Sequence, residues 1–257
     1  MTKHGQRKQL KRIVAPPIFP IPRKIIGKFV IKPTPGPHPR SRSIPLGIIV
    51  RDVLKYARTL KEVKHILNKG AIKIDGRTIR NYRFPVGMMD IIEIPKLDER
   101  YRVIPYARSF ILHKINKEEA KYKIVRVKTK RLASKGKFQI GLEDGRSFLL
   151  DIEKDGDLIG KIRVGDSLMI TVPKQSIVKH FPLQENMYAM ITAGHHMGRH
   201  GKIIKIHKIF GPKASTVHIV TTKEEEIVTA LDYVLVIGEE GPSISLPEQF
   251  INETRDR

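Results

Sequence analysis

The stretch from Ile44 to Ile94, IPLGIIVRDVLKYARTLKEVKHILNKGAIKIDGRTIRNYRFPVGMMDIIEI, decides the fold of the first half of the chain. Apolar residues from Leu46 to Ala57 recur at helical spacing and predict an amphipathic helix. Thr59 followed by Glu62 forms a capping box, which predicts a second helix that ends near a glycine. Asp75-Gly76 is a hairpin turn signal. We therefore expect two helices, a hairpin and a closing strand.

The same stretch is basic, with ten Lys and Arg against five Asp and Glu, a net charge of +5. A charged helix face is most often only solvated, but this imbalance favours a surface that binds an anionic partner. Phosphate groups of nucleic acid are the anions that such a surface commonly meets. The candidate contacts on the two helices and the hairpin are Arg51, Lys55, Arg58, Lys61, Lys64, Lys73 and Arg77.

The run from Thr59 to Gly76, together with Gly87 and the later Asp90-Ile91-Ile92, resembles the S4-type RNA-binding domain. That domain occurs in ribosomal proteins, pseudouridine synthases and tyrosyl-tRNA synthetase. Leu60 stands where an arginine is usual, and two methionines separate the usual Gly-Asp pair. The resemblance implies a small α/β RNA-binding module, which we place at residues 43–106.

Composition narrows the function of the whole chain. Its 257 residues suit two or three domains, and 49 Lys and Arg against 26 Asp and Glu give a net charge of +23. Such an excess predicts a polyanionic partner, with nucleic acid favoured over a membrane surface because no long apolar run is present. The absence of Cys excludes disulfides and thiol catalysis and fits a reducing cytoplasm. The first twelve residues lack the apolar core of a secretory signal.

The N-terminal segment, residues 1–42, is predicted to be a basic extended arm. The first 51 residues hold twelve Lys and Arg, no acid and nine of the 17 prolines. Proline at this density prevents regular structure, so the isolated arm is expected to be poorly ordered. It is either a tail without a role or an arm that orders on RNA, and the lack of acids favours the second. The candidate contacts are Lys3, Arg7, Lys8, Lys11 and Arg12, with Arg40 and Arg42 at a hinge.

Beyond the module, the sequence predicts mainly β-strands. Strand-like alternation predicts a β-rich middle domain at 107–175, with a basic rim at Lys128, Lys130, Arg131, Lys135 and Lys137. Five further short strands predict a small closed barrel at 176–257. The loop GHHMGRHGK, residues 194–202, lies between two strand-like runs and resembles the KOW motif of SH3-like barrels; Arg199 and Lys202 are its candidate contacts. The predicted class is α+β, predominantly β, in several domains.

Each candidate motif for catalysis or metal binding lacks a feature that its chemistry requires. His196 and His200 have the spacing of two metal ligands on a helix, but glycines break any helix there and no Glu or Cys completes the set. We expect these loop histidines near phosphate and no metal. The GxxG of a KH domain joins two helices, whereas strand-like runs flank Gly198 to Gly201. No acid–base carboxylate pair or nucleophile elbow stands out. We therefore expect neither an enzyme nor a cofactor.

The order of arm, module, β-rich middle and KOW-like barrel resembles the archaeal and eukaryotic type of small-subunit ribosomal protein four, the e family, from end to end. The resemblance is carried by residues 5–12, 36–38, 120–123, 194–201 and 244–247. It implies a structural constituent of the small ribosomal subunit in the cytoplasm. Its partners would be small-subunit rRNA and neighbouring ribosomal proteins, with no membrane and no small-molecule substrate.

Two other classes stay open. An RNA-modifying enzyme that uses the module for targeting would need a catalytic domain bearing an aspartate. After the arm, module and barrel are subtracted, too little chain remains for such a domain of ordinary size. A transcription-elongation factor would use the barrel to bind polymerase, and the basic arm argues against it.

Overall fold

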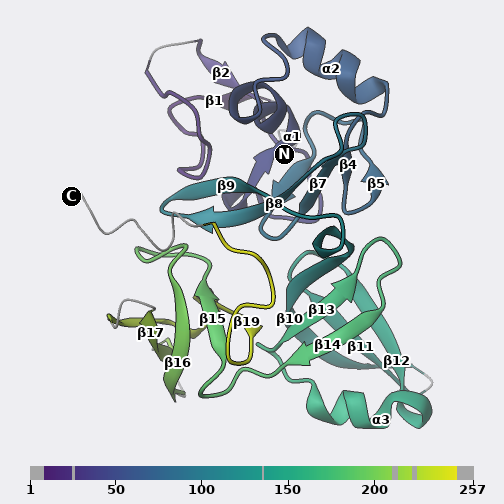
Figure 1. Cartoon of the computed structure of the whole chain (residues 1–257), viewed down its shortest axis with the longest axis vertical. Helices are drawn as coiled ribbons and strands as arrows, with labels where there is room; N and C mark the ends of the chain where they lie inside the picture. The colour runs from purple at the N-terminus through teal and green to yellow at the C-terminus, as the bar shows by residue number, and fades with distance from the viewer. Residues whose placement is uncertain (1–8, 25–26, 135, 210–213, 222–224, 248–257) are drawn as a thin grey trace, which may run out of the picture.

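The computed structural model describes residues 9–24, 27–134, 136–209, 214–221 and 225–247 (Figure 1). Three five-stranded sheets and two two-stranded ribbons make up most of this part of the chain, and helices are few and short. All strand pairs are antiparallel, as short hairpin connections allow. The predicted class, α+β and predominantly β, is confirmed. Within the described residues, no helix is long and apolar enough to cross a membrane.

The first sheet carries the module and has the strand order β5-β4-β7-β8-β9. Asp75 and Gly76 both have positive φ, 49° and 74°, and form the predicted tight turn between its first two strands. A separate ribbon pairs β3 (Ser43–Pro45) with β6 (Pro85–Gly87). The sheet strands are β4 (Lys73–Ile74), β5 (Arg77–Thr78), β7 (Ile91–Ile94), β8 (Glu99–Tyr106) and β9 (Ser109–Lys114).

The first helix is shorter than its apolar spacing predicts. α1 (Leu46–Ile48) continues into one π-helical segment, Ile49–Val53, and the helix does not extend to Ala57. Leu54 N–H donates to the carbonyl of Ile49 at 2.8 Å, so the turn widens. Lys55 then takes a φ of 58°, which ends the helix and turns the chain towards the second one.

The second helix, α2 (Leu60–Asn68), forms as predicted. The backbone N–H of Glu62 donates to the Thr59 hydroxyl at 3.3 Å, and the Glu62 carboxylate accepts from the backbone N–H of Arg58 at 2.8 Å. Gly70, with a φ of 69°, follows the end of the helix. Val63 and Leu67 face the core.

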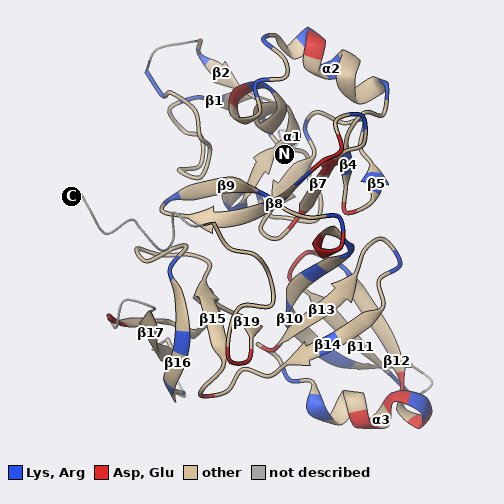
Figure 2. Ribbon diagram, viewed as in Figure 1, with Lys and Arg blue, Asp and Glu red and all other residues tan. Residues whose placement is uncertain are grey.

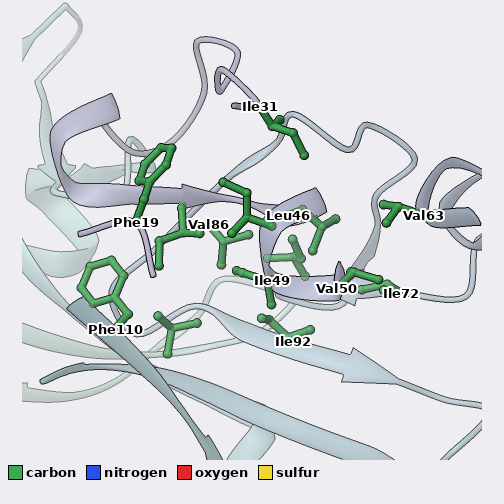
Figure 3. Packing of buried hydrophobic residues seen from close by; sticks show 14 of the residues in the cluster. Phe19, Ile31, Leu46, Ile49, Val50, Val63, Ile72, Val86, Ile92 and Phe110 are labelled. Carbon is green, nitrogen blue, oxygen red and sulfur yellow. The ribbon is translucent and has the colours of Figure 1, made fainter. Parts of the chain in front are cut away.

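The N-terminal segment folds onto the module, which corrects the expectation of a poorly ordered arm for its described residues. β1 (Leu10–Lys11) pairs with β2 (Phe29–Val30), and η1 (Arg40–Arg42) is a short 3-10 turn. Phe19 and Ile31 lie in one hydrophobic cluster with Leu46 and Val86 of the module (Figure 3). Proline prevents regular structure here, but the apolar side chains between the prolines are buried in the module's core. The residues of the segment that belong to this hydrophobic cluster are Leu10, Ala15, Ile18, Phe19, Ile21 and Ile31.

The second sheet has the order β12-β11-β10-β13-β14 and the third the order β18-β17-β16-β15-β19. The second sheet and its helix contain β10 (Tyr122–Ala133), β11 (Lys137–Leu142), β12 (Ser147–Asp151), α3 (Ile152–Lys161), β13 (Ser167–Thr171) and β14 (Ile177–Phe181). The third contains β15 (Tyr188–Ile191), β16 (His200–His207), β17 (Thr216–Thr221), β18 (Glu226–Ala230) and β19 (Val234–Gly238). Two 3-10 turns, η3 (Glu119–Lys121) and η4 (Leu231–Tyr233), link strands.

The sheets meet in a shared core rather than hanging on linkers (Figure 1). Met89 and Ile104 of the first sheet's region belong to the same buried cluster as Phe181 and the strands of the third sheet. The domain boundary predicted between residues 106 and 107 lies inside the β8–β9 hairpin. The boundary predicted between residues 175 and 176 lies just before β14. Pairing between β18 and β19, which would close the third sheet into a barrel, is absent among the described residues. The SH3-like barrel stays a prediction.

Candidate nucleic-acid interface

A buried cluster of charged side chains lies between the first and second sheets. The ammonium of Lys123, on β10, is 2.9 Å from Asp75, 2.6 Å from Asp90 and 3.2 Å from Asp144. Asp75 is in the β4–β5 turn, Asp90 precedes β7, and Asp144 is in the β11–β12 turn. All four side chains are buried. Motifs far apart in the sequence therefore converge on one lysine.

Two further residues complete this charge cluster. Arg146 donates to Asp75 and lies 3.2 Å from Asp144, while His38 of the N-terminal segment is 3.0 Å from Asp90. Burial opposes ionisation of Asp90, but the charges of Lys123 and His38 outweigh it and lower the pKa of its carboxyl. Burial likewise opposes the charge of Lys123, and the surrounding carboxylates raise the pKa of its ammonium. Asp90 and Lys123 therefore stay ionised at neutral pH.

This arrangement removes two acids, Asp75 and Asp90, from the outer surface of the module. Asp75 and Asp90 are 5% and 2% exposed and face cations of other parts of the chain. Asp52 pairs with its neighbour Arg51 at 2.8 Å. Glu62 caps α2, and the hydrogen bond from the Arg58 backbone lowers the pKa of its carboxyl. Only Glu93 remains of the five acids in this stretch, and it is half-buried.

Cations remain on the outside along α2 and around β5, as Figure 2 shows. The end of α2 lies against β5, since a Cβ on Gly70 would be 3.2 Å from Thr78. Lys64 lies 5.0 Å from the ring of Tyr82, a cation–π distance. We call the exposed set the module surface; none of its members makes an ion pair within the part of the chain that the structure describes. It consists of Lys55, Arg58, Lys61, Lys64, Lys69, Arg77 and Arg80.

Five of the predicted contacts belong to this surface, namely Lys55, Arg58, Lys61, Lys64 and Arg77. A sixth, Lys73, is half-buried on β4, next to β5. Lys69 and Arg80 are members that the list of candidate contacts omits. Both stand in the same acid-poor stretch, so its charge imbalance was the signal that could have included them.

Other predicted contacts are engaged within the protein. Arg12 is a correction: it is 9% exposed, and its guanidinium donates to the carbonyls of Gly27 at 3.1 Å and Pro22 at 2.9 Å. It holds the N-terminal loop together instead of facing solvent. Arg51 pairs with Asp52, Arg42 with Glu143 at 2.8 Å, and Arg199 with Glu225 at 2.7 Å. Lys11, Arg40 and Lys202 are exposed, whereas Lys3, Arg7 and Lys8 lie outside the described residues.

The basic rim expected on the middle domain has fewer free cations than predicted, because two of its lysines bind groups within the protein. Lys130 is half-buried and donates to the carbonyls of Ile159 and Ile162, the latter at 2.9 Å. Lys137 pairs with Asp151 at 3.1 Å. Of the remaining rim residues, Lys128 and Arg131 are exposed and Lys135 lies outside the described residues.

The glycine-rich loop has the expected strands on either side, β15 and β16, and Gly194 and Gly198 have φ of 88° and 94°. His200 is buried and its Nδ1 lies 2.7 Å from the Tyr188 hydroxyl. Burial lowers the pKa of both His196 and His200, so neither carries a positive charge at neutral pH; their position near phosphate stays a prediction. No group of three potential metal ligands gathers among the described residues.

Comparison with known proteins gives matches along nearly the whole chain. The family described as "Ribosomal family S4e" matches residues 97–177, and the "RS4NT (NUC023) domain" matches residues 4–41. The chain is 42% identical to small ribosomal subunit protein eS4 of Staphylothermus marinus, over 96% of this chain and 99% of that protein. It is 40% identical to the eS4 protein of Methanothermobacter thermautotrophicus, over 95% and 97% of the two chains.

A solved structure is also similar. The crystal structure of 30S ribosomal protein S4e from Thermoplasma acidophilum aligns with a TM-score of 0.65 and 36% sequence identity. The alignment covers 77% of this chain and 96% of that chain.

Proposed function

The chain belongs to the S4e family of small-subunit ribosomal proteins, and from this premise we propose that it binds small-subunit rRNA through phosphate and shape contacts. In this role it is a structural constituent that supports subunit assembly and translation. The observation that carries the proposal is the module surface, where seven exposed cations have no ion-pair partner among the described residues, while Asp75 and Asp90, two of the five acids between residues 44 and 94, are buried.

Duplex RNA suits such a surface. Its major groove is too deep and narrow for side chains to read, so proteins bind its phosphates, 2′-hydroxyls and shape. Lysine and arginine gain affinity there chiefly by releasing counterions from phosphate. We propose the module surface with Lys73 as the main contact. Lys11, Arg40 and Lys202 are further contacts. Arg42, Arg51 and Arg199 would exchange a carboxylate partner for phosphate, at least cost for Arg199, whose partner Glu225 is exposed.

We also propose a domain organisation, protein partners and a compartment for the chain. The N-terminal segment, the module, the β-rich middle domain and an SH3-like barrel form the organisation, with limits near Ser43, Ile115 and Pro182 where the sheets end. Neighbouring ribosomal proteins are the expected protein partners, the compartment is the cytoplasm, and the role is structural without a catalytic step or cofactor.

Co-sedimentation tests the assignment to the ribosome. A tagged copy expressed in a related archaeon should sediment with small subunits and remain there through a high-salt wash. Recovery only in the soluble fraction would show that the protein is not a constituent of the subunit.

A charge-neutralised variant tests the module surface. Arg58, Lys61 and Lys64 are changed together to Gln, and affinity for transcribed small-subunit rRNA is measured over a range of salt. If all three cations contact phosphate, the slope of log affinity against log salt should fall by about two to three units.

The matched control changes Lys154, Lys161 and Arg163 to Gln, three exposed cations in and just after α3, at the opposite end of the molecule (Figure 1). It loses the same net charge. Equal slopes for the two triple variants would mean that the module surface does not face the RNA.

A further inference from the structure

A groove of about 1,200 Å³ runs along the folded N-terminal segment, apart from the module surface. Four cations line it, namely Lys11, Lys28, Lys32 and Arg40, and no acid is among its described lining residues. By charge alone, the groove suits an anionic chain.

One wall of the groove is the β1–β2 ribbon. Leu10 lies opposite Val30, and Lys11 lies opposite Phe29. Leu10 is buried and Val30 packs on the core cluster, so this pair faces inward. Side chains alternate along a strand, and directly opposed residues share a face. Lys11 and Phe29 therefore stand side by side on the outward face.

Phe29 is 45% exposed and lines the groove together with Val14, which is 67% exposed. The ammonium of Lys28 lies 5.8 Å from the centre of the Phe29 ring. The exposed aromatic ring is thus held between two lysines, Lys28 and Lys11, on a paired strand.

A second part of the groove lining is also preformed. It includes the stretch from Pro33 to Gly36, where Thr34 donates its backbone N–H and its hydroxyl to the carbonyl of Arg83, at 3.0 and 3.2 Å. Prolines on either side of Thr34 restrict the backbone further. A ligand would meet a groove of which both parts are already in place, which lowers the entropy cost of binding.

Cations that follow a backbone, combined with an exposed aromatic ring, are the features that bind single-stranded nucleic acid. In a duplex the faces of the bases are stacked on one another and a phenyl ring cannot reach them. An unpaired strand presents both phosphates and free base faces.

We propose that this N-terminal groove binds an unpaired segment of RNA, with one base stacked on Phe29 and adjacent phosphates on Lys11, Lys28 and Arg40. The inference rests on the proposed function and deepens it. The module surface takes duplex RNA by its backbone, and the groove takes a neighbouring unpaired strand.

The test uses the full chain and fluorescence anisotropy. Its probes are a labelled single-stranded RNA of about 10 nucleotides, within the range of known single-strand sites, and a duplex of the same length. Phe29→Ala should weaken single-strand binding about tenfold or more through loss of stacking, while Phe29→Tyr keeps it within about threefold. Duplex binding should not change in either variant. Lys28→Gln should lower the single-strand salt slope by about 0.7.

Leu149→Ala is the matched control, since Leu149 is an exposed apolar residue on β12, 64% exposed and outside the groove. It should leave both affinities unchanged, and thermal melts of all variants confirm folding. An unchanged single-strand affinity in Phe29→Ala overturns the proposal, and so does an equal loss for single strand and duplex.

The two proposals fail in different ways. If the protein sediments with small subunits but Phe29→Ala has no effect, only the groove is wrong. If the protein does not sediment with small subunits, the proposed function is wrong whatever Phe29→Ala does to oligonucleotide binding.

Discussion

Replacing Lys123 by Met tests whether the buried charge cluster holds the first two sheets together. Methionine preserves much of the side chain's length and removes its charge. Among the described residues, Asp75 and Asp144 would then keep Arg146 as an ion-pair partner, and Asp90 would keep its contact with the His38 ring. Removing one partner of a buried ion pair costs about 3–5 kcal/mol of unfolding free energy, because the other charge is left without compensation.

A loss of this size should be visible in a thermal melt. For a chain of this length, 1 kcal/mol corresponds to roughly 2–4 °C in Tm, so Lys123→Met should melt about 6 to 20 °C below the wild type. Far-UV circular dichroism gives the melt, and urea titration gives the free energy.

The pH dependence distinguishes loss of charge compensation from simple loss of packing. In the wild type the pKa of Asp90 is lowered, so its contribution is fully present above the unfolded value near 4 and is lost only in acid. In Lys123→Met the buried carboxylates lack their cation, and burial raises their pKa in the folded state. The variant then takes up a proton on folding, and its stability falls as pH rises. The gap to the wild type should therefore narrow when pH falls from about 8 to about 5.

Lys121→Met is the matched control. Lys121 is two residues away, and its ion pair with Glu118, at 2.6 Å, is exposed to solvent. Exposed pairs contribute about 0–1 kcal/mol, so this variant should melt close to the wild type at every pH. The reasoning is refuted if the two methionine variants lose similar stability, or if the gap for Lys123→Met is the same at both ends of the pH range.

Four further substitutions test helix capping, close packing and a second buried ion pair. Thr59→Ala removes the cap of α2 and should cost about 1 kcal/mol, seen as faster amide hydrogen exchange in the first turn of that helix. Gly201→Ala places a Cβ 2.0 Å from a carbonyl oxygen of β17 and should cost at least about 1–3 kcal/mol in urea unfolding. Gly156→Ala, in an open position on α3, should be neutral or gain up to about 1 kcal/mol. Glu119→Gln removes the ion pair at 3.1 Å from the buried guanidinium of Arg102, and its Tm should fall by several degrees more than that of Glu118→Gln, which breaks only an exposed pair.

Local chemistry made part of the fold predictable from sequence. The capping box at Thr59, the glycine after α2 and the Asp75-Gly76 turn all act through atoms a few residues apart. The end of the first helix was not predictable in this way. A lysine rarely adopts positive φ, and only tertiary packing places Lys55 there.

The long-range contacts of the turn residues could not be predicted from the sequence. Asp75-Gly76 and Asp144-Gly145 are both turn signals, and both pairs lie in tight turns between neighbouring strands. In the fold each turn also directs its carboxylate at Lys123, a contact that spans up to 48 residues in sequence. The packing of the N-terminal segment against the module was not predictable either, because it also depends on distant residues. Its prolines exclude regular structure, but they do not prevent Phe19 and Ile31 from entering a core formed elsewhere.

The position of the acids explains how one stretch serves both stability and binding. On the outer surface, Asp75 and Asp90 would lie close enough to the module's cations to reduce their attraction for phosphate, because screening at physiological salt acts only beyond about 8 Å. Both carboxylates point instead into the interface with the second sheet, where Lys123 compensates them. The same two acids therefore join the sheets and leave the module surface positively charged. A variant that exposed them would weaken both properties together.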